Sequence, residues 1–399
     1  MYKLYCRIYQ YVFKMVFYLL PWRKPEIIEG VDSVNYLPKL IKDKDIDKVI
    51  VITGKIISSI GLMDGFLEGL KNEGVDFVIY NNTSQNPTID NVEEALEMYK
   101  SNNCKGIVAF GGGSPIDCAK AVGARLACPN KSILQMRGDL KVGKEIPPLF
   151  AVPTTAGTGS EATIVAVITN SSTHEKLVIG DMVLTPHYAV LDPSLTVGLP
   201  PDITAATGMD ALTHAIEAYI GRSNTKETSE LSRMAVKLIF ENIYEVYRNG
   251  ANVEARGSML KASNYAGMAF TRAYVGYVHA IAHTLGGFYG TPHGLANAVI
   301  LPYVLEYYGE EAYKPLAELT DVVLLGNSTD NLEQKSYNFI KAIKKLNKDM
   351  NIPDKISGIN DSDIPLMVER AYKEANPNYP VPKILSKKDL FSIYEMIKD

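Results

Sequence analysis

The sequence predicts an α/β domain built on a parallel sheet, followed by an all-α domain. Between about residues 30 and 196, short β-branched apolar runs alternate with segments of helical periodicity. This alternation is typical of a parallel sheet covered by helices. Beyond about residue 200, strand-like runs largely stop and long helical patterns replace them. A chain of 399 residues also exceeds one typical core, so two domains are expected.

The expected strands are near-continuous apolar runs, which indicates burial on both faces of a sheet. They cover residues 47–53, 76–80, 106–110, 148–152 and 188–192. Residues 91–101 lie between two of them and have helical spacing. We therefore expect an open sheet with helices on both faces, an architecture that binds dinucleotides at the carboxyl ends of its strands.

The second half of the chain is expected to be helical. In residues 230–247, Leu231, Met234 and Leu238 follow one another at steps of three and four. The double proline Pro200–Pro201 suggests a hinge before this half. The predicted division is an apolar extension over residues 1–25, a dinucleotide-binding α/β domain over 26–196 and a helical metal-binding domain over 197–399.

Net charge and cysteine content indicate which binding partners and which cellular compartment to expect. The net charge of −4 gives no electrostatic reason to expect nucleic acid. The four cysteines show neither a CxxC spacing nor a disulfide framework. That usage suits a reducing compartment, so we expect a cytoplasmic protein.

Residues 2–20 form a strongly apolar and aromatic segment. Lys3, Arg7, Gln10 and Lys14 lie at steps of four, three and four, and so form one narrow polar stripe on a helix. These charges argue against a membrane-spanning helix, and no small-residue cleavage site marks a signal peptide. We expect an extension that packs on its own domain or on a neighbouring subunit. A helix lying at a membrane surface is the less favoured alternative.

Two polar loops follow successive strands of the first domain. The strand at 106–110 runs into GGGSPID (111–117), where three glycines allow close approach of a ligand and a helix N-terminus favours an anion. Alone, this loop does not distinguish a phosphate site from a tight turn. The next strand runs into PTTAGTGSEAT (153–163), which places several hydroxyls at the same edge. Together the two loops predict a dinucleotide site.

The histidines form a pattern that suggests a metal site. The chain has six histidines, and four lie within 80 residues of one another. Asp210 and His214 are four residues apart, as are His279 and His283, so each pair shares one helical face. His293 follows on a Thr-Pro-His-Gly loop. A carboxylate with imidazoles suits Fe²⁺ or Zn²⁺.

A metalloprotease site is another interpretation of two of these histidines. HAIAH (279–283) is superficially similar to a metalloprotease HExxH, but Ala280 stands at the place of the general base. A metalloprotease is therefore not favoured. His174 and His187 lie outside the pattern and are expected to be structural or surface residues.

The motifs, taken together, closely resemble those of the iron-containing (group III) alcohol dehydrogenase family from about residue 30 to about residue 310. They are GGGSPIDCAK (111–120), PTTAGTGSEAT (153–163), DPSLTVGLPP (192–201), GMDALTHAIEAY (208–219), VHAIAH (278–283) and PHGLANAVILP (292–302). The resemblance implies a dehydroquinate-synthase-like fold, with a nucleotide-binding α/β domain and a helical metal-binding domain.

The resemblance also implies roles for individual residues. The positions that match the family's metal ligands are Asp210, His214, His279 and His293. His283 matches an active-site histidine that does not bind the metal. The positions that match cofactor contacts are Gly112, Gly113, Ser114, Thr154, Thr155, Thr158 and Lys176, with Asn86, Thr163 and Leu195 added on weaker matches.

Two positions depart from the family pattern. Many members carry an aspartate after the first strand, which binds the ribose 2′-hydroxyl and repels a 2′-phosphate. Here that place reads Thr53-Gly54-Lys55, so Gly54 faces the ribose without a carboxylate and NADP(H) is expected at least as much as NAD(H). Thr284 follows the active-site histidine where the family often has proline, which predicts a reshaped pocket.

The expected function is therefore hydride transfer between a primary alcohol or aldehyde and NAD(P), at Fe²⁺ or, as an alternative, Zn²⁺. A lyase or polyol dehydrogenase on the same fold is one alternative function. A non-catalytic metal or nucleotide sensor is another. The apolar extension favours at least a dimer, so a homo-oligomer is expected.

Overall fold

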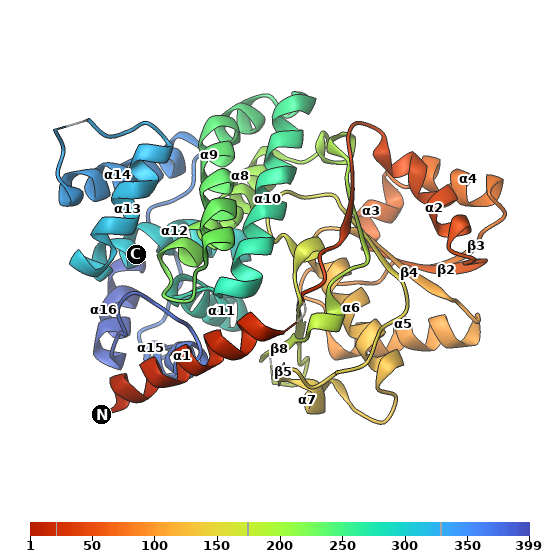
Figure 1. Ribbon diagram of the computed structural model, residues 1–399, viewed down its shortest axis with the longest axis horizontal. Helices are drawn as coiled ribbons and strands as arrows, with labels where there is room; N and C mark the ends of the chain where they lie inside the picture. Colours follow the sequence, from red (N-terminus) through yellow and green to blue (C-terminus); the bar gives the residue numbers. More distant parts are fainter. Residues whose placement is uncertain (21, 174, 328) are drawn as a thin grey trace. The chain divides into compact units, whose positions relative to one another are not determined.

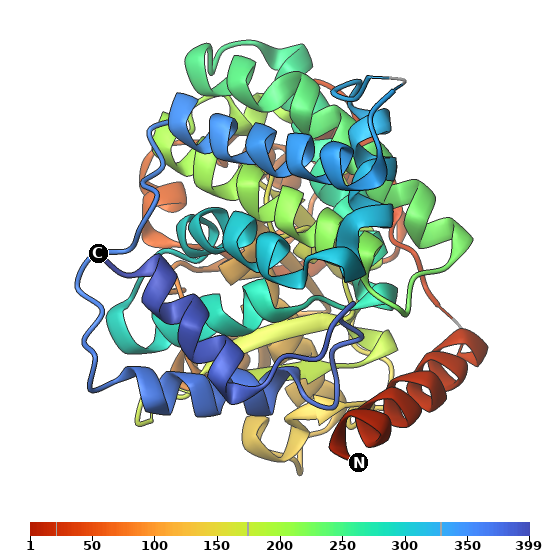
Figure 2. The same cartoon turned by 90° about the vertical axis from the view of Figure 1, so that its left-hand side faces the viewer.

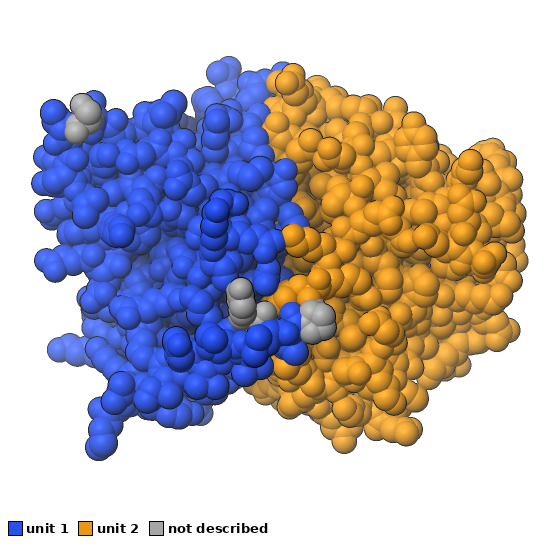
Figure 3. Space-filling model, viewed as in Figure 1, with its two compact units in different colours: residues 1–20, 200–250, 265–399 blue, residues 21–199, 251–264 orange. Residues whose placement is uncertain are grey.

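The computed structural model describes residues 1–20, 22–173, 175–327 and 329–399. His174, expected to be a structural or surface residue, lies outside the described residues. The chain divides into two compact units, which Figure 3 shows in two colours. Unit 1 contains residues 1–20, 200–250 and 265–399, and unit 2 contains residues 21–199 and 251–264. The division into separate domains with boundaries at residues 26 and 197 stays a prediction.

Unit 2 is built on a six-stranded sheet in the order β1-β9-β6-β4-β2-β3, and every described pairing in it is parallel. The strands are β1 Glu26–Glu29, β2 Lys48–Ile52, β3 Asp76–Tyr80, β4 Gly106–Gly111, β6 Leu149–Pro153 and β9 Tyr188–Leu191. The predicted parallel α/β fold is thus confirmed. The edge strand β1 was not predicted, because its two isoleucines stand alone between glutamates.

Helices cover both faces of this sheet, which explains the continuous apolar strands. One face packs on α5 Ile89–Ser101 and α6 Gly113–Ala127, and the other packs on α2 Leu37–Asp43 and α4 Asp64–Asn72 (Figure 1). A short helix, α3 Lys55–Ser59, follows β2. A separate three-stranded sheet, not predicted, orders β5 Gly138–Asp139, β8 Lys176–Gly180 and β7 Val165–Thr169.

Unit 1 is helical, as predicted. Its helices include α8 Pro201–Ile220, α9 Lys226–Arg248, α11 Tyr277–Tyr289, α12 His293–Tyr308, α13 Glu310–Val322, α14 Leu332–Asp349, α15 Ile364–Ala375 and α16 Lys387–Ile397. Helix α10, Val253–Ala273, has residues in both units. Residues 208–220 of α8 are all buried, so α8 is the central helix of the unit. It packs against α9 and α12, and α11 packs against α12 and α15.

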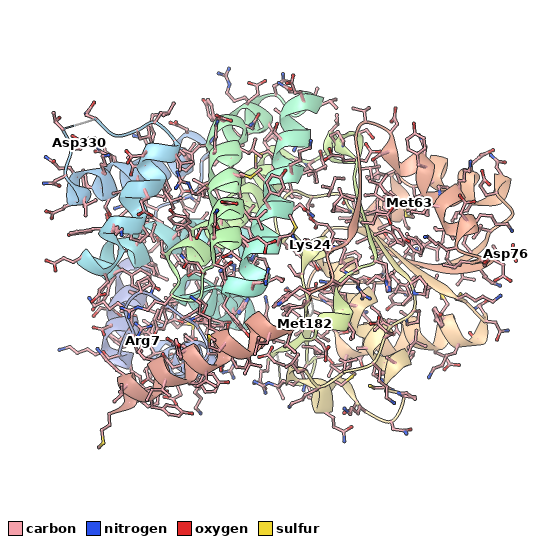
Figure 4. The ribbon with its side chains drawn as sticks, in the orientation of Figure 1. Arg7, Lys24, Met63, Asp76, Met182 and Asp330 are labelled. Carbon is pink, nitrogen blue, oxygen red and sulfur yellow. The ribbon has the colours of Figure 1, made fainter. Side chains whose placement is uncertain are left out.

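Helix α1, Tyr2–Leu19, belongs to unit 1 and packs on it through most of its polar stripe and through the buried Cys6 and Phe17. Arg7 donates to the carbonyls of Val381 and Pro382, at 2.7 and 2.8 Å (Figure 4). Gln10 and Lys14 likewise donate to backbone carbonyls of residues 377, 379, 222 and 224. The large apolar side chains that face outward include Leu4, Tyr5, Ile8, Tyr11, Val12, Met15 and Leu19. The helix lies at the edge of unit 1 (Figure 2).

Among the described residues, the hydropathy of each helix falls short of what a bilayer-crossing segment requires.

Candidate metal centre and nucleotide-binding loops

Three of the predicted metal ligands converge in unit 1. Asp210 lies on α8, His279 on α11, and His293 is the first residue of α12. One donor atom from each lies within 4.8 Å of the other two. Oδ1 of Asp210 is 3.5 Å from Nε2 of His293 and 3.8 Å from Nε2 of His279. Residues separated by more than 80 positions therefore form one compact donor set, as the sequence predicted.

A close crossing of two helices brings His293 to this set. At Gly294, an added Cβ would lie 2.2 Å from the carbonyl oxygen of Ala206. Real Cβ atoms do not approach backbone that closely, so only glycine allows the start of α12 to lie against α8. The glycine that follows His293 in the sequence is therefore part of the metal centre's architecture.

Glu217 fixes the orientation of His279. The Nδ1 atom of His279 lies 2.6 Å from Oε2 of Glu217. The same oxygen accepts the N–H of Gly276, and Oε1 accepts the N–H of Val278, at 2.8 Å each. Nδ1 therefore donates, and Nε2 presents its lone pair to the donor set. Burial raises the pKa of Glu217 to about 7, and the backbone N–H groups oppose that rise.

Sequence reasoning missed Glu217, although a signal was present. The residue lies seven positions after Asp210, in the run 215–220 of α8, which is otherwise apolar. An acidic residue at a helical period from a ligand, inside an apolar run, needs a buried donor. The first turn of α11 supplies that donor together with the ligand itself.

His214, the fourth predicted ligand, is buried beside the donor set but is not a member of it. Its ring stacks on that of His279, with ring centroids 4.4 Å apart, and on that of Phe270, with centroids 4.2 Å apart. The group of mutually close donor atoms comprises Asp210, His279 and His293. Metal binding by His214 therefore stays a prediction.

His283, predicted to act beside the metal, lies next to the donor set. Its ring stacks on that of His293, with centroids 5.2 Å apart. Nδ1 of His283 lies 2.6 Å from Oε1 of Glu374, and the hydroxyl of Tyr379 donates to the same oxygen at 2.8 Å. The carboxylate thus holds Nδ1–H and leaves Nε2 as the atom that can exchange a proton. Nothing in the sequence around Glu374 marks it for this role.

Thr284 and His187 each have a structural role. The Thr284 hydroxyl bonds to the carbonyl of Ile281 and to the hydroxyl of Tyr394, at 2.7 and 2.6 Å. It is therefore a buried structural group on the helix that carries both histidines. His187, in unit 2, accepts the N–H of Leu149 at 3.1 Å, and burial lowers its pKa to about 4. Its expected structural role is confirmed.

In unit 2 the two predicted polar loops lie against each other. The N–H of Thr154 bonds to the carbonyl of Gly111 at 3.0 Å. A Cβ at Gly113 would lie 2.7 Å from Cγ2 of Thr158, and one at Gly112 would lie 3.2 Å from the Thr155 hydroxyl. The glycines therefore let the start of α6 approach the threonine loop. The free N–H groups of that helix start lie among hydroxyls.

The other predicted cofactor residues follow neighbouring strands. Gly54 follows β2 and precedes α3, with an extended backbone. Asn86 lies in the loop after β3, and the neighbouring Gln85 accepts a hydrogen bond from the Ser114 hydroxyl. Leu195 follows β9 and is buried. Gly54, Asn86 and the glycine loop thus lie at the carboxyl ends of adjacent strands, where such sheets bind ligands.

Thr163 and Lys176 lie beside a buried ionic network. Lys120 of α6 donates to the hydroxyl and carbonyl of Thr163 at 2.8 Å, and burial lowers the pKa of Lys120 to about 8. Burial raises the pKa of Asp117 on the same helix, while the charges of Lys120 and Lys176 oppose the rise. The Thr163 side chain is thus bound within the protein. Sequence reasoning missed this network.

Comparisons with known proteins agree with this architecture. Residues 24–193 match the family model described as iron-containing alcohol dehydrogenase, and residues 204–397 match that of the C-terminal region of the same family. A 1,3-propanediol dehydrogenase of Klebsiella pneumoniae is 40% identical over 82% of this chain and 86% of its own length. Alcohol dehydrogenase 4 of Saccharomyces cerevisiae (strain YJM789) is 41% identical over 87% of this chain and 90% of its own.

A solved structure gives the same result. The alcohol dehydrogenase from Oenococcus oeni superimposes with a TM-score of 0.91 at 35% sequence identity, over 94% of this chain and 99% of that one. The sequence resemblance, the parallel-sheet and helical units, and the convergent donor set are thus all consistent with one assignment. The chain belongs to the iron-containing alcohol dehydrogenase family and is an NAD(P)-dependent oxidoreductase of alcohols.

Proposed function

We propose that the chain interconverts primary alcohols and aldehydes with NAD(P), at a divalent ion held by Asp210, His279 and His293, with His214 as the fourth ligand. The convergence of the first three carries the proposal. Oδ1 of Asp210 accepts, and Nε2 of His279 is also an acceptor once Glu217 holds the Nδ1 proton of His279. A buried carboxylate and imidazole nitrogens that face one another form a donor set suited to a cation. Fe²⁺ fits this set best, and Zn²⁺ is the alternative.

The bound ion supplies Lewis acidity toward the alcohol or carbonyl oxygen, and the bound nicotinamide accepts or supplies the hydride. The protein positions both and moves the proton. His283, held at Nδ1 by Glu374, takes a proton at Nε2 during alcohol oxidation and returns it during aldehyde reduction. Its side chain is 13% exposed, compared with 3% for His279. His283 is therefore the one of the two with access to solvent.

The two polar loops of unit 2 support the coenzyme assignment. The start of α6 offers N–H groups to the pyrophosphate, and Thr154, Thr155 and Thr158 line the neighbouring loop. At the ribose, Gly54 offers no carboxylate, and the next residue is the exposed Lys55. We therefore propose that the enzyme accepts NADP(H) as well as NAD(H).

The test combines elemental analysis of anaerobically prepared protein with assays of a panel of primary alcohols and aldehydes. We expect about one divalent ion per chain and aldehyde-dependent oxidation of NADPH or NADH at 340 nm. Metal-loaded protein that binds the coenzyme but gives no absorbance change with any alcohol or aldehyde would contradict the proposal. Such a result would favour a lyase or a sensor on this fold.

We also propose that the enzyme works in the cytoplasm as a homo-oligomer. All four cysteines are free and buried, which suits a reducing compartment. The outward apolar face of α1 is the feature that favours subunit association. Sedimentation analysis of the purified chain tests the second point.

A further inference from the structure

Helix α1 supplies hydrogen-bond donors to an irregular segment of unit 1. The segment covers residues 377–382, between α15 and α16, and residues 379–382 are buried. The carbonyls of residues 377 and 379 accept from Gln10, and those of residues 381 and 382 accept from Arg7, at 2.7 to 3.0 Å. The region that the family models match begins at residue 24, so these donors come from a helix outside it.

The composition of the 377–382 segment explains why it needs donors from elsewhere. Pro377, Pro380 and Pro382 have no N–H group, and the segment forms neither a helix nor a strand. Few donors therefore lie within the segment, and a buried carbonyl without a donor costs free energy. Gln10 is only 5% exposed, and its amide nitrogen donates to two of these carbonyls.

A path of hydrogen bonds leads from Gln10 to His283. Gln10 bonds to the carbonyl of Tyr379, and the hydroxyl of Tyr379 donates to Oε1 of Glu374 at 2.8 Å. The same oxygen lies 2.6 Å from Nδ1 of His283. Tyr379 thus bonds to α1 through its backbone and to the carboxylate that orients His283 through its side chain. A shift of Tyr379 would displace that carboxylate and the imidazole with it.

The flanks of the segment are bonded to helix α11, which carries His283. The hydroxyl of Tyr277, at the start of α11, donates to Oδ1 of Asn376 at 3.1 Å and accepts the N–H of Leu385 at 3.1 Å. These two residues lie on either side of the 377–382 segment. Helix α11 therefore holds the flanks, while α1 holds the part that contains Tyr379.

We propose that Gln10 is a positioning residue for His283. Through Gln10, α1 holds the 377–382 segment so that Tyr379 and Glu374 keep the imidazole in the orientation that proton transfer requires. The proposal rests on the proposed role of His283 and extends it to a helix outside the family models. Because Tyr379 and Glu374 separate Gln10 from His283, a substitution of Gln10 should lower kcat and leave the KM values and the metal content unchanged.

The principal variant is Q10L, whose side chain is of similar size but has no donor. The control is K14M, on the same polar stripe of α1. Lys14 donates to the carbonyls of residues 222 and 224, which lie outside the 377–382 segment. Comparison of the two variants separates the loss of this segment's donors from a general loosening of α1.

Two further variants test the path itself. Y379F leaves α1 intact and removes the hydrogen bond to Glu374, so it tests the other end of the path. The double variants Q10L/H283A and Y379F/H283A ask whether the effects pass through His283, because residues that act through one group are not additive. If Q10L folds poorly in a thermal melt, Y379F and its double variant decide the question.

We expect Q10L and Y379F to lower kcat roughly tenfold, with KM values and metal content like those of the wild type. K14M should match the wild type throughout, and neither Q10L nor Y379F should slow H283A further. The inference fails if folded Q10L or Y379F keeps the wild-type kcat, or if K14M is as slow as Q10L. It also fails if Q10L slows H283A as much as it slows the wild type. An H283A variant with wild-type kcat would overturn the proposed role of His283 as well, whereas a slow H283A beside an unaffected Q10L would overturn this inference alone.

Discussion

At the scale of single residues, the metal centre depends on a carboxylate that does not bind the metal. Glu217 holds His279 in one tautomer. In the E217Q variant, the NH₂ group of the side-chain amide would face N–H groups that the carboxylate accepts in the wild type. We expect E217Q to weaken Zn²⁺ or Co²⁺ binding by 10- to 100-fold. The measurement is competition with a chelator of known affinity.

A neighbouring glutamate provides the control for this prediction. Glu318 accepts a hydrogen bond from Tyr219 of the same helix α8, at 2.8 Å, and does not touch a donor residue. E318Q should bind the metal like the wild type. Equal affinity in E217Q and the wild type would show that His279 keeps its orientation without the carboxylate.

Substitutions of the two histidines of α11 should distinguish metal binding from catalytic turnover. His279 belongs to the donor set, whereas His283 is held by Glu374 at its edge. We expect H279A to lose metal and activity together. We expect H283A to keep its metal, measured by elemental analysis, while kcat falls by roughly 10²- to 10⁴-fold. Equal metal retention in both variants would refute this division of roles.

The coenzyme preference should respond to a carboxylate at residue 54. A Cβ there would lie 3.5 Å from the nearest atom, the carbonyl oxygen of Thr83, and the extended backbone at the start of α3 suits aspartate. G54D should therefore fold normally and raise the ratio of kcat/KM for NAD(H) over NADP(H), by about tenfold or more, because the carboxylate repels a 2′-phosphate. An unchanged ratio would place residue 54 away from the ribose.

Residue spacing predicted part of this site. Helical pairs and a Pro-His-Gly loop predicted a cluster that includes Asp210, His279 and His293, because periodicity reports which residues share a face. The family resemblance, not the spacing, separated the metal ligands from His283. Glu374 could not be found in this way, because its role depends on which helices pack together, which spacing along one helix does not report. Thr163, expected at the cofactor, accepts a hydrogen bond from Lys120, because the buried ammonium needs acceptors; its contact with the cofactor stays a prediction.

At the scale of helices and strands, the crossing of α8 and α12 requires glycine at residue 294. The clashing atom in G294A is a backbone oxygen, so the helix must shift to relieve the contact. We expect a loss of about 1–3 kcal/mol in the free energy of unfolding, with weaker metal binding because His293 moves too. Denaturant titration and metal analysis measure the two effects.

The matched control is G257A, in helix α10. A Cβ at residue 257 would make only ordinary contacts of 3.8 Å, with Pro193. Alanine there should be neutral or stabilising, because it has the higher helix propensity. If both variants unfolded alike, the crossing at residue 294 would have more room than its geometry indicates.

The sequence predicted the central strands of the parallel sheet but missed its edge strand and the second sheet. The strands β2, β4 and β6 are almost fully buried and read as continuous apolar runs, whereas β1, β7 and β8 are only partly buried and β5 has two residues. For α1 the periodicity gave the polar stripe but not its direction. The stripe faces the protein because backbone carbonyls at residues 377–382 and 222–224 accept its donors. No pattern along the helix reveals those acceptors.

At the scale of the whole molecule, buried Lys120 should affect the pH dependence of stability. Burial lowers its pKa from 10.5 to about 8. Between these two values the unfolded chain binds a proton that the folded chain does not, so stability rises with pH. We expect the free energy of unfolding of the wild type to rise by roughly 2 kcal/mol relative to K120M between pH 8 and pH 10.

An exposed lysine supplies the comparison. Lys105 forms a surface ion pair with Asp47 at 2.8 Å, and K105M should run parallel to the wild type over this pH range. A constant difference between wild type and K120M would show that Lys120 keeps its ordinary affinity for a proton inside the fold.

The bonding of Glu217 has a consequence for how the enzyme acquires its ion. One carboxylate caps the first turn of α11 and aims His279, so contacts within the protein hold this part of the site without help from the ion. Uptake then need not drive folding, unlike in a zinc finger, and the ion can exchange without unravelling the chain. The metal found in each molecule should therefore follow cellular supply during its lifetime, rather than being fixed at synthesis.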